Sequence, residues 1–315
     1  MNYIGIDIGG TQVKMGIVSA EGVVGNTAAY DVAFDGYKTP IMDTVMQKLA
    51  VFLEENGLEE NQISGIGVSA TGQIDVKEGT VVGAAGHIKN WEGCCIRERI
   101  KSLYSVPVSV MNDANCAALA EQWIGAAKGA TDAIVITVGT GVGGGIINNS
   151  EILCGAGGCA GELGHITIRN NGRMCSCGNR GCYEQYASTT ALVKMVKQAV
   201  KKDEVPVSLF KDGIINGKTI FEAIKKDVAL EACVNKWIGY VADGLVGMIH
   251  TFDPQVVLVG GGVSVQKEYF IDPLRAQIKS RIMHEYAKHV TIDAAKLGND
   301  AGLIGAVCYC IKHGN

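Results

Sequence analysis

Short apolar runs alternate along the chain with longer stretches in which apolar residues recur every three to four positions. The short runs predict strands, and the longer stretches predict helices. The clearest helix is predicted from Pro40 to Asn56, with Thr39 as its N-cap, Pro40 at the first helical position and Gly57 as its stop. Further helices are predicted over residues 114–125, 188–202, 221–226, 231–252 and 301–312. Strands are predicted over residues 3–8, 14–18, 63–68, 106–111, 133–138, 144–147, 166–168 and 256–259. Alternation of this kind indicates an α/β fold.

One pattern of strand, Gly/Thr turn, strand, turn and strand occurs twice. It begins with Tyr3-Ile-Gly-Ile-Asp-Ile-Gly-Gly-Thr and returns as Ala133-Ile-Val-Ile-Thr-Val-Gly-Thr-Gly. Internal repetition of a supersecondary unit indicates repeated architecture. We therefore expect two like-folded domains that face each other across a cleft, each offering a Gly/Thr turn to the same ligand.

The first of these turns is a candidate phosphate site. Asp7 precedes Gly9, Gly10 and Thr11 at the end of an apolar strand. Successive backbone N–H groups in a tight turn bind anions, and glycine lets a phosphate approach closely. The turn is suited to the triphosphate of ATP. The alternative is an ordinary hairpin in which Asp7 is solvated.

Two further glycine turns follow predicted strands. Gly139 to Gly144, which includes Thr140 and Gly141, matches the dinucleotide-binding pattern G-x-G-x-x-G. That fingerprint requires a helix directly afterwards, whereas the next residues predict a β-hairpin, so a dinucleotide-binding domain is disfavoured. Gly260, Gly261 and Gly262 could let an adenine or a ribose lie against bare backbone, although a structural turn explains them almost as well.

A candidate general base lies where a predicted strand meets a predicted helix. Asn112, Asp113 and Asn115 share this junction. Phosphoryl transfer needs alignment, charge neutralisation and a base for the proton of the attacking hydroxyl, and Asp113 is our candidate for that base. The competing interpretation makes Asp113 the N-cap of the helix. Mg²⁺ would be carried by the ATP oxygens and water, with Asp7 as an outer-sphere partner.

Four residues have the spacing of a closed metal site: His165, Cys175, Cys177 and Cys182. Three thiolates and one imidazole form a tetrahedral set typical of structural Zn²⁺. A nucleic-acid-binding zinc ribbon is disfavoured, because the acidic residues Glu162 and Glu184 border the cluster. These two carboxylates and His165 could reach sugar hydroxyls.

Composition limits the remaining classes. The net charge of -4 provides no basic field for nucleic acid. We expect a cytoplasmic protein without a membrane partner, because the sequence has neither a secretion signal nor an apolar run of about 18 residues. The eleven cysteines then predict free thiols, and those outside the metal cluster are predicted to be small core residues.

The motifs together resemble the ROK family (repressor, open reading frame, kinase) over nearly the whole chain. The resemblance rests on DIGGT at Asp7, NDANCAALAE at Asn112, GTGVGG at Gly139, GELGH at Gly161, CSCGNRGCYE at Cys175 and VGGG at Val259. It implies an actin-like ATPase fold of the hexokinase and Hsp70 type, with two ribonuclease-H-like domains closing over ATP and a hexose. The smaller domain would cover residues 1–115, completed by residues 299–315, and the larger would cover residues 116–298 with the zinc loop. The resemblance also suggests a homodimer.

The resemblance assigns roles to individual residues. Asp113 would be the general base, and Zn²⁺ would lie on the four residues named above. The sugar would be held by Gly72, His87, Asn112, Asp113, Glu162, His165 and Glu184. If His165 serves both metal and sugar, its second ring nitrogen must face the substrate. Lys14, two positions after a place where many relatives have Lys, is added to the nucleotide-binding candidates.

The expected activity is that of a glucokinase-like sugar kinase, acting at the 6-hydroxyl of a hexose. His87 stands where family glucokinases have a sugar-contacting Asn, which leaves glucose, an N-acylated hexosamine or a glycoside open as the acceptor. Repressor members carry an N-terminal DNA-reading domain, and the start of the first strand at Tyr3 favours the kinase branch. The alternative is a sugar-sensing regulator without catalysis.

Overall fold

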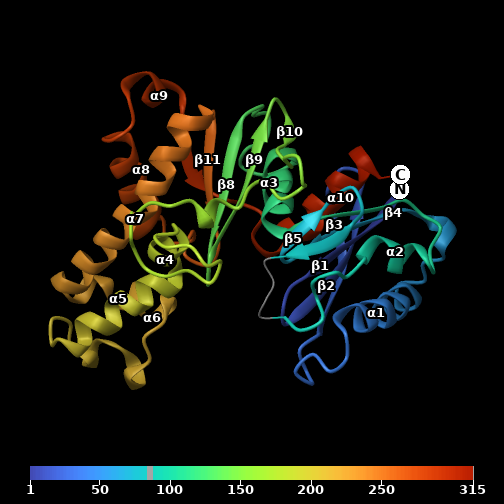
Figure 1. The fold of residues 1–315 in the computed structure, drawn as a ribbon, viewed down its shortest axis with the longest axis horizontal. Helices are drawn as coiled ribbons and strands as arrows, with labels where there is room; N and C mark the ends of the chain where they lie inside the picture. Colours follow the sequence, from blue (N-terminus) through green and yellow to red (C-terminus); the bar gives the residue numbers. More distant parts are fainter. Residues whose placement is uncertain (84–87, 315) are drawn as a thin grey trace. The chain divides into compact units, whose positions relative to one another are not determined.

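The computed structural model describes residues 1–83 and 88–314 (Figure 1). Its strands are β1 (Asn2–Ile8), β2 (Gln12–Ser19), β3 (Val24–Asp31), β4 (Ile63–Ala70), β5 (Gln73–Asp75), β6 (Thr80–Gly83), β7 (Val108–Asn112), β8 (Ala133–Val138), β9 (Val142–Asn148), β10 (Glu151–Ile152), β11 (Val256–Gly260) and β12 (Thr291–Ala294). Its α-helices are α1 (Ile41–Glu55), α2 (Ile96–Lys101), α3 (Asp113–Trp123), α4 (Glu184–Ala187), α5 (Thr189–Lys201), α6 (Gly217–Ala223), α7 (Val228–Phe252), α8 (Asp272–Lys279), α9 (His284–His289) and α10 (Ala301–His313).

Two five-stranded sheets share one strand order. The first sheet runs β3-β2-β1-β4-β7, and the second runs β10-β9-β8-β11-β12. In the first, β1 is antiparallel to β2 and parallel to β4; in the second, β11 is parallel to both β8 and β12. The predicted α/β fold and the predicted repeat are therefore confirmed.

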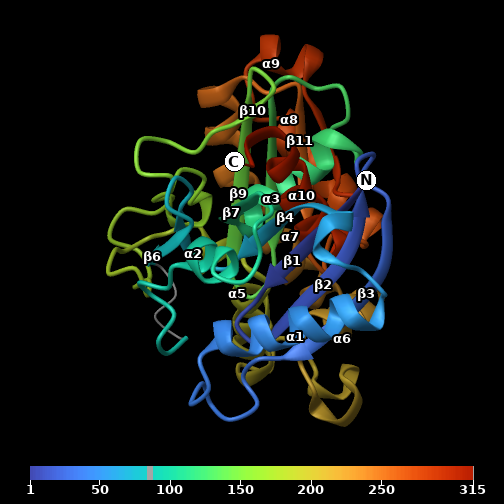
Figure 2. The same ribbon diagram turned by 90° about the vertical axis from the view of Figure 1, so that its right-hand side faces the viewer.

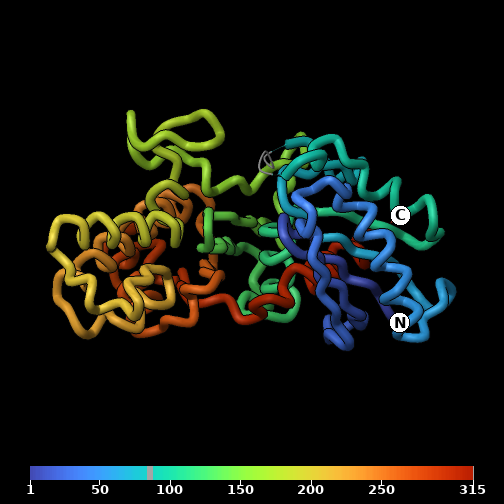
Figure 3. The backbone as a smooth tube through the Cα atoms, turned by 90° about the horizontal axis from the view of Figure 1, so that it is seen from below, coloured from blue at the N-terminus to red at the C-terminus, as the bar shows by residue number. Residues whose placement is uncertain are grey.

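The chain divides into two compact units. Unit 1 comprises residues 1–129, 145–161 and 297–315, and unit 2 comprises residues 130–144 and 162–296. The first strand and the last helix both belong to unit 1, where they pack together (Figure 3). Helix α3 also belongs to unit 1, where it packs against α10. The boundaries predicted at residues 115 and 299 stay a prediction.

The two faces of the first sheet differ because side chains alternate along a strand. Ile4 and Ile6 belong to the apolar core that also contains the buried residues of α1. Gly5 and Gly67 face α10, where a Cβ at Gly67 would lie 2.2 Å from the carbonyl oxygen of Ala306. Absence of these side chains lets α10 lie directly on the sheet. Figure 2 shows β1, β2 and β3 side by side with α1 along them.

Unit 2 has an aromatic core around its longest helix, α7. Trp237 is fully buried and stacks on Phe270 with ring centroids 4.9 Å apart. Its indole N–H donates to the carbonyls of Ala187 and Ser188, at the junction of α4 and α5. This buried side chain therefore connects α7 to the junction of α4 and α5.

Several local predictions were wrong. Pro40, and not Thr39, is the cap residue of α1. The Thr39 hydroxyl donates to Asp35 at 2.7 Å, in the loop before the helix, and is therefore not available to cap α1. Residues 166–168 form no strand; Thr167 makes only an isolated bridge with Cys182, inside the loop that carries the predicted metal ligands. The helix predicted from Phe221 begins earlier, at Gly217, because Asn216 caps it. Strands β5, β6 and β12 and helices α2, α4, α8 and α9 were not predicted.

The cysteines are all free thiols. Of those outside the metal cluster, Cys116, Cys308 and Cys310 are buried, as predicted for core residues. Cys94 is half-buried and packs against the core of unit 1, which agrees with the prediction. The prediction was wrong for four others, which are only half-buried: Cys95, Cys154, Cys159 and Cys233. Among the helices of residues 1–83 and 88–314, none has the length and apolar character that spanning a membrane requires.

Candidate active site

The candidate residues of unit 1 gather at one edge of its sheet. Strands β1, β4 and β7 are parallel, with Ile8 opposite Ala70 and Ala70 opposite Asn112. Parallel strands end at the same edge, where α/β proteins bind ligands. The turn after β1, the turn after β4 and the start of α3 therefore lie next to one another.

The turn after β1 is a closed hairpin around Gly9, whose N–H donates to the Gln12 carbonyl at 2.9 Å. Asp7 just before it accepts a 2.6 Å hydrogen bond from the Ser69 hydroxyl, and Gly302 of α10 covers its carboxyl group. Burial raises the pKa of Asp7, while the Ser69 hydroxyl and the Lys14 charge act in the opposite direction. Asp7 is therefore not solvated as the alternative required, and the binding of a phosphate by this turn stays a prediction.

Lys14, a predicted nucleotide ligand, lies on β2 and forms an ion pair with Asp300. Its ammonium group also donates to the Asn299 carbonyl, so Lys14 links β2 to the segment that opens α10. Its proposed contact with a nucleotide stays a prediction.

Asn112, and not Asp113, caps α3. The Asn112 side-chain oxygen accepts from the N–H groups of Ala114 and Asn115, and its amide donates to the Gly72 carbonyl at 2.9 Å. Asp113 is the first residue of the helix and is exposed, with one carboxylate oxygen 2.8 Å from the Ala114 nitrogen. The capping explanation for Asp113 was therefore wrong.

Gly72 lies in the turn after β4 with a φ of +102°, a conformation that favours glycine. The turn is held by Trp91, whose indole N–H donates to the Thr71 carbonyl at 2.9 Å. This brings Gly72, Asn112 and Asp113 to one place, as predicted for the sugar site. His87, predicted to contact the sugar, lies outside the described residues.

Unit 2 has its own pair of glycine turns. The Gly139 N–H donates to the Gly141 carbonyl at 3.0 Å, and β9 follows directly, so the chain continues as a hairpin and not as a dinucleotide-binding helix. Gly260 pairs with Thr137 of β8, and Gly261 has a φ of +91°. A Cβ at Gly261 would lie 2.2 Å from the Val138 carbonyl oxygen, so only glycine lets the two turns touch.

A pocket of about 680 Å³ opens between these turns and two helix starts of unit 2. The Thr189 N–H donates to Gly139, and the Thr190 hydroxyl donates to Thr140 at 2.8 Å. The pocket is lined by Val138, Gly139, Thr140, Thr189, Thr190, Val193, Asn216, Gly217, Lys218, Phe221, Gly262, Val263, Val265 and Gln266. Our sequence analysis missed the lining from α5 and α6. The signals available were Ser188 and Asn216, since both residues cap the helices that reach the pocket.

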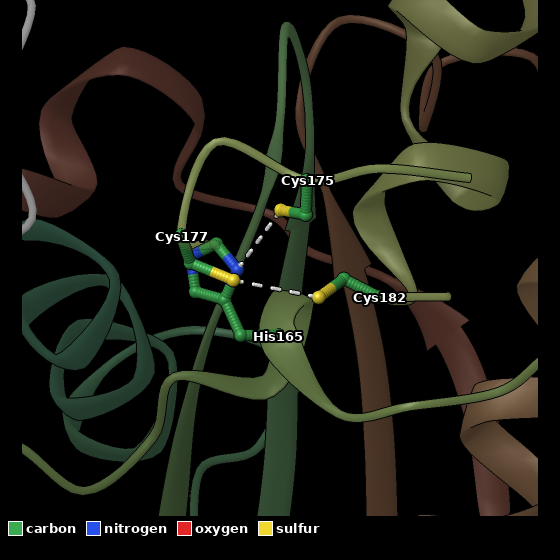
Figure 4. Close-up of side chains that lie close together, drawn as sticks. All are labelled: His165, Cys175, Cys177 and Cys182. Carbon is green, nitrogen blue, oxygen red and sulfur yellow. Dashed lines mark hydrogen bonds between the residues drawn. The ribbon is translucent and has the colours of Figure 1, made fainter. Parts of the chain in front are cut away.

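The four predicted metal ligands come together in unit 2 (Figure 4). All their ligand atoms lie within 4.8 Å of one another. Cys177 Sγ is 3.5 Å from Cys182 Sγ, and Cys175 Sγ is 3.6 Å from His165 Nδ1. A tetrahedral Zn²⁺ with Zn–S bonds of about 2.3 Å requires sulfurs about 3.8 Å apart, so the donor set fits this metal.

The surroundings of the cluster shift the pKa values of its thiols in opposite directions. The Asn179 N–H lowers the pKa of the exposed Cys177, whereas burial raises the pKa of Cys182 to about 12. A bound cation favours the thiolate form of such ligands. The segment that carries them forms a loop, drawn in yellow-green in Figure 3.

One ring nitrogen of His165 faces the three cysteines, and the other lies near Glu162, a predicted sugar-binding residue. Nδ1 faces Cys175, and Nε2 lies 3.9 Å from a carboxylate oxygen of Glu162. Glu184 accepts from the Cys175 thiol at 3.2 Å, and its other oxygen lies against Gly141. The second ring nitrogen of His165 therefore lies beside Glu162, and its contact with a substrate stays a prediction.

Comparison with known proteins identifies the class to which this fold and site belong. The ROK family model matches residues 3–313. A glucokinase of Halalkalibacterium halodurans is 32% identical over 308 residues, covering 96% of this chain and 93% of that protein. A beta-glucoside kinase of Listeria monocytogenes is 30% identical over 317 residues, covering 100% and 99%.

The solved structure of a ROK family glucokinase from Streptomyces griseus, in complex with glucose and AMPPNP, has a TM-score of 0.83 and 35% identity. The match covers 97% of this chain and 98% of that chain. The class is thus that of the actin-like ATPase fold found in sugar kinases. This chain belongs to the ROK family, which confirms the predicted resemblance.

Proposed function

We propose that this ROK family protein is a sugar kinase that transfers the γ-phosphoryl group of ATP to the 6-hydroxyl of a hexose. One observation carries the proposal: Asp113 is an exposed carboxylate at the edge where β1, β4 and β7 end, and Asn112 already caps the helix. A carboxylate in this position can accept the proton that the attacking hydroxyl loses. The kinase names of the relatives support the same class.

The glycine turns supply the phosphate and nucleoside contacts in this proposal. The N–H groups at Gly10 and Thr11 stabilise phosphate oxygens, because successive backbone N–H groups in a turn bind anions. The Gly9 N–H closes the hairpin by donating to the Gln12 carbonyl, so Gly9 contributes by letting the phosphate approach closely. The pocket beside Thr140 and Gly262 takes the nucleoside, since its walls are apolar with a few hydroxyl and amide groups. Gly141, Gly260 and Gly261 lie in the same two turns as Thr140 and Gly262, next to the residues that line the pocket.

Sugar hydroxyls in turn pair with the polar side chains predicted from the resemblance. Asn112 and Gly72 act beside Asp113, and Glu162, His165 and Glu184 act from the loop that the metal ligands hold. Zn²⁺ on His165, Cys175, Cys177 and Cys182 would be structural and leave no position for water. Mg²⁺ bound with ATP supplies charge neutralisation, and Asp7 would hold it through water.

A coupled ADP-release assay over a sugar panel tests the proposal. The panel contains glucose, mannose, N-acetylmannosamine, N-acetylglucosamine and β-glucosides. We expect ADP release that depends on at least one of these sugars. Sugar binding by calorimetry without any ADP release would instead support the sugar-sensing regulator.

Asp7→Asn is predicted to raise stability while it lowers activity. Burial lifts the folded-state pKa of Asp7 above its ordinary value of 3.8. The folded chain then binds this proton more tightly than the unfolded chain, so the stabilisation is complete below pH 3.8 and is lost as pH rises through the folded-state pKa. At neutral pH the uncharged Asn should raise Tm by on the order of 2 °C. Loss of the charge should lower kcat/KM for ATP about tenfold.

Thermal unfolding and ATP-dependent kinetics of the same preparation measure both effects. Asp31→Asn, on the exposed end of β3, is the matched control and should change neither quantity. A lower Tm with unchanged ATP kinetics in Asp7→Asn would contradict the role given to this carboxylate.

Homodimer formation, a cytoplasmic location and the absence of a nucleic-acid partner stay predictions.

A further inference from the structure

Between β3 and α1 runs a loop, residues 32–40, that returns to the glycine turn after β1. Its first residue, Val32, donates its N–H to the Thr11 carbonyl at 2.9 Å. Five residues later the Tyr37 hydroxyl donates to the Gly10 carbonyl at 2.7 Å. Two consecutive carbonyls of the turn are therefore held by one loop.

We propose that Tyr37 is a positioning residue that orients the phosphate-binding turn for the nucleotide. In a trans peptide the C=O and the following N–H point in opposite directions. The peptide bonds of the described residues are all trans. The hydroxyl that holds the Gly10 carbonyl on one side therefore directs the Thr11 N–H to the other side, where an anion can accept its hydrogen bond.

The loop is built to hold this hydroxyl in place. Tyr37 has a φ of +64°, a conformation that a non-glycine residue rarely adopts. The Asp35 carboxylate fixes the turn around it by accepting from the N–H groups of Lys38 and Thr39, at 3.0 and 2.9 Å, and from the Thr39 hydroxyl. These hydrogen bonds also lower the pKa of Asp35, the Thr39 hydroxyl contributing most. Tyr37 packs against the core of unit 1, so its ring is anchored as well.

The arrangement rests on the proposed function, because it assigns a phosphate to the turn. It adds a residue about thirty positions from the DIGGT motif that the motif does not identify. The contribution is indirect: Tyr37 contacts the far side of the peptide group whose N–H would bind the ligand. Removal of its hydroxyl should weaken nucleotide binding and leave the sugar contacts unchanged.

Tyr37→Phe tests the proposal, because it removes only the hydroxyl. We expect KM for ATP and the Kd for a non-hydrolysable ATP analogue to rise about fivefold, the effect of one neutral hydrogen bond. KM for the sugar, kcat at saturating ATP and Tm should stay at the wild-type values, as for a loss of binding shared by the ground state and the transition state.

Tyr30→Phe is the matched control. Tyr30 lies on β3 and packs against the same core, and its buried hydroxyl has no hydrogen-bond partner among the described residues. Its removal should change none of these quantities. Asp35→Ala, which releases the loop, should reproduce the ATP-selective loss.

ATP affinity in Tyr37→Phe equal to that of Tyr30→Phe would overturn the proposal, as would wild-type ATP affinity in Asp35→Ala. A parallel loss of Tm and of sugar affinity would also overturn it, because that result indicates a general structural role. The proposed function fails in a different way, namely when the wild-type protein phosphorylates no sugar. Calorimetry with the ATP analogue still decides the part played by Tyr37 in that case.

Discussion

Asp113→Ala is expected to lower kcat by about a hundredfold to ten-thousandfold, the usual contribution of a general base. The carboxylate is exposed on the first turn of α3, and the cap of that helix is supplied by Asn112. Folding should therefore be nearly unaffected. Affinity for the sugar, measured by calorimetry, should change much less than kcat.

Asp43→Ala is the matched control, because Asp43 is likewise an exposed carboxylate in the first turn of a helix of unit 1. It should retain wild-type turnover. More than about a tenth of the wild-type kcat in Asp113→Ala would remove this residue from the role of base.

Cys182→Ser is expected to have the second large effect. Protein purified without chelator should contain about one zinc per chain, and the variant should contain less than a tenth of that amount. Cys182 is fully buried in the cluster, so a loss of the metal leaves the loop of residues 165–182 without its central contact. Because metal binding is coupled to folding, Tm should fall by several degrees or more.

Metal analysis by mass spectrometry, together with thermal unfolding, measures both outcomes. Cys233→Ser is the control, since Cys233 is a half-buried thiol on α7 and is not part of the cluster. Wild-type protein with far less than one zinc per chain would contradict the assignment. A Cys182→Ser variant that keeps its zinc would exclude Cys182 as a ligand.

Features that depend on neighbouring residues could be predicted from the sequence. The turns at Gly9 and Gly139 end apolar strands, and each requires small residues at successive positions, so a short stretch reveals them. The repeat of strand, turn and strand likewise predicted two sheets, and both have the same strand order. The spacing of Cys175, Cys177 and Cys182 placed these thiols in one loop, where they meet His165.

Helix boundaries were harder to predict, because competing partners lie nearby in the sequence. Thr39 and Asp113 are both residue types that favour an N-cap. In the structure Thr39 bonds to Asp35, and Asn112 takes the cap of α3. Propensity alone does not decide between such partners, since their hydrogen bonds have similar energies.

Only the tertiary structure decided which residues far apart in the sequence contact one another. Lys14 meets Asp300, and the glycine turn at residues 139–141 meets α5 through Thr189 and Thr190. Tyr37 reaches Gly10 from another loop. The sequence around a hydroxyl or a charged group is the same whether that group is solvated or paired with a distant residue. The sequence by itself therefore determined the turns, the repeat and the cluster, whereas the packing of strands and helices determined which distant side chains complete them.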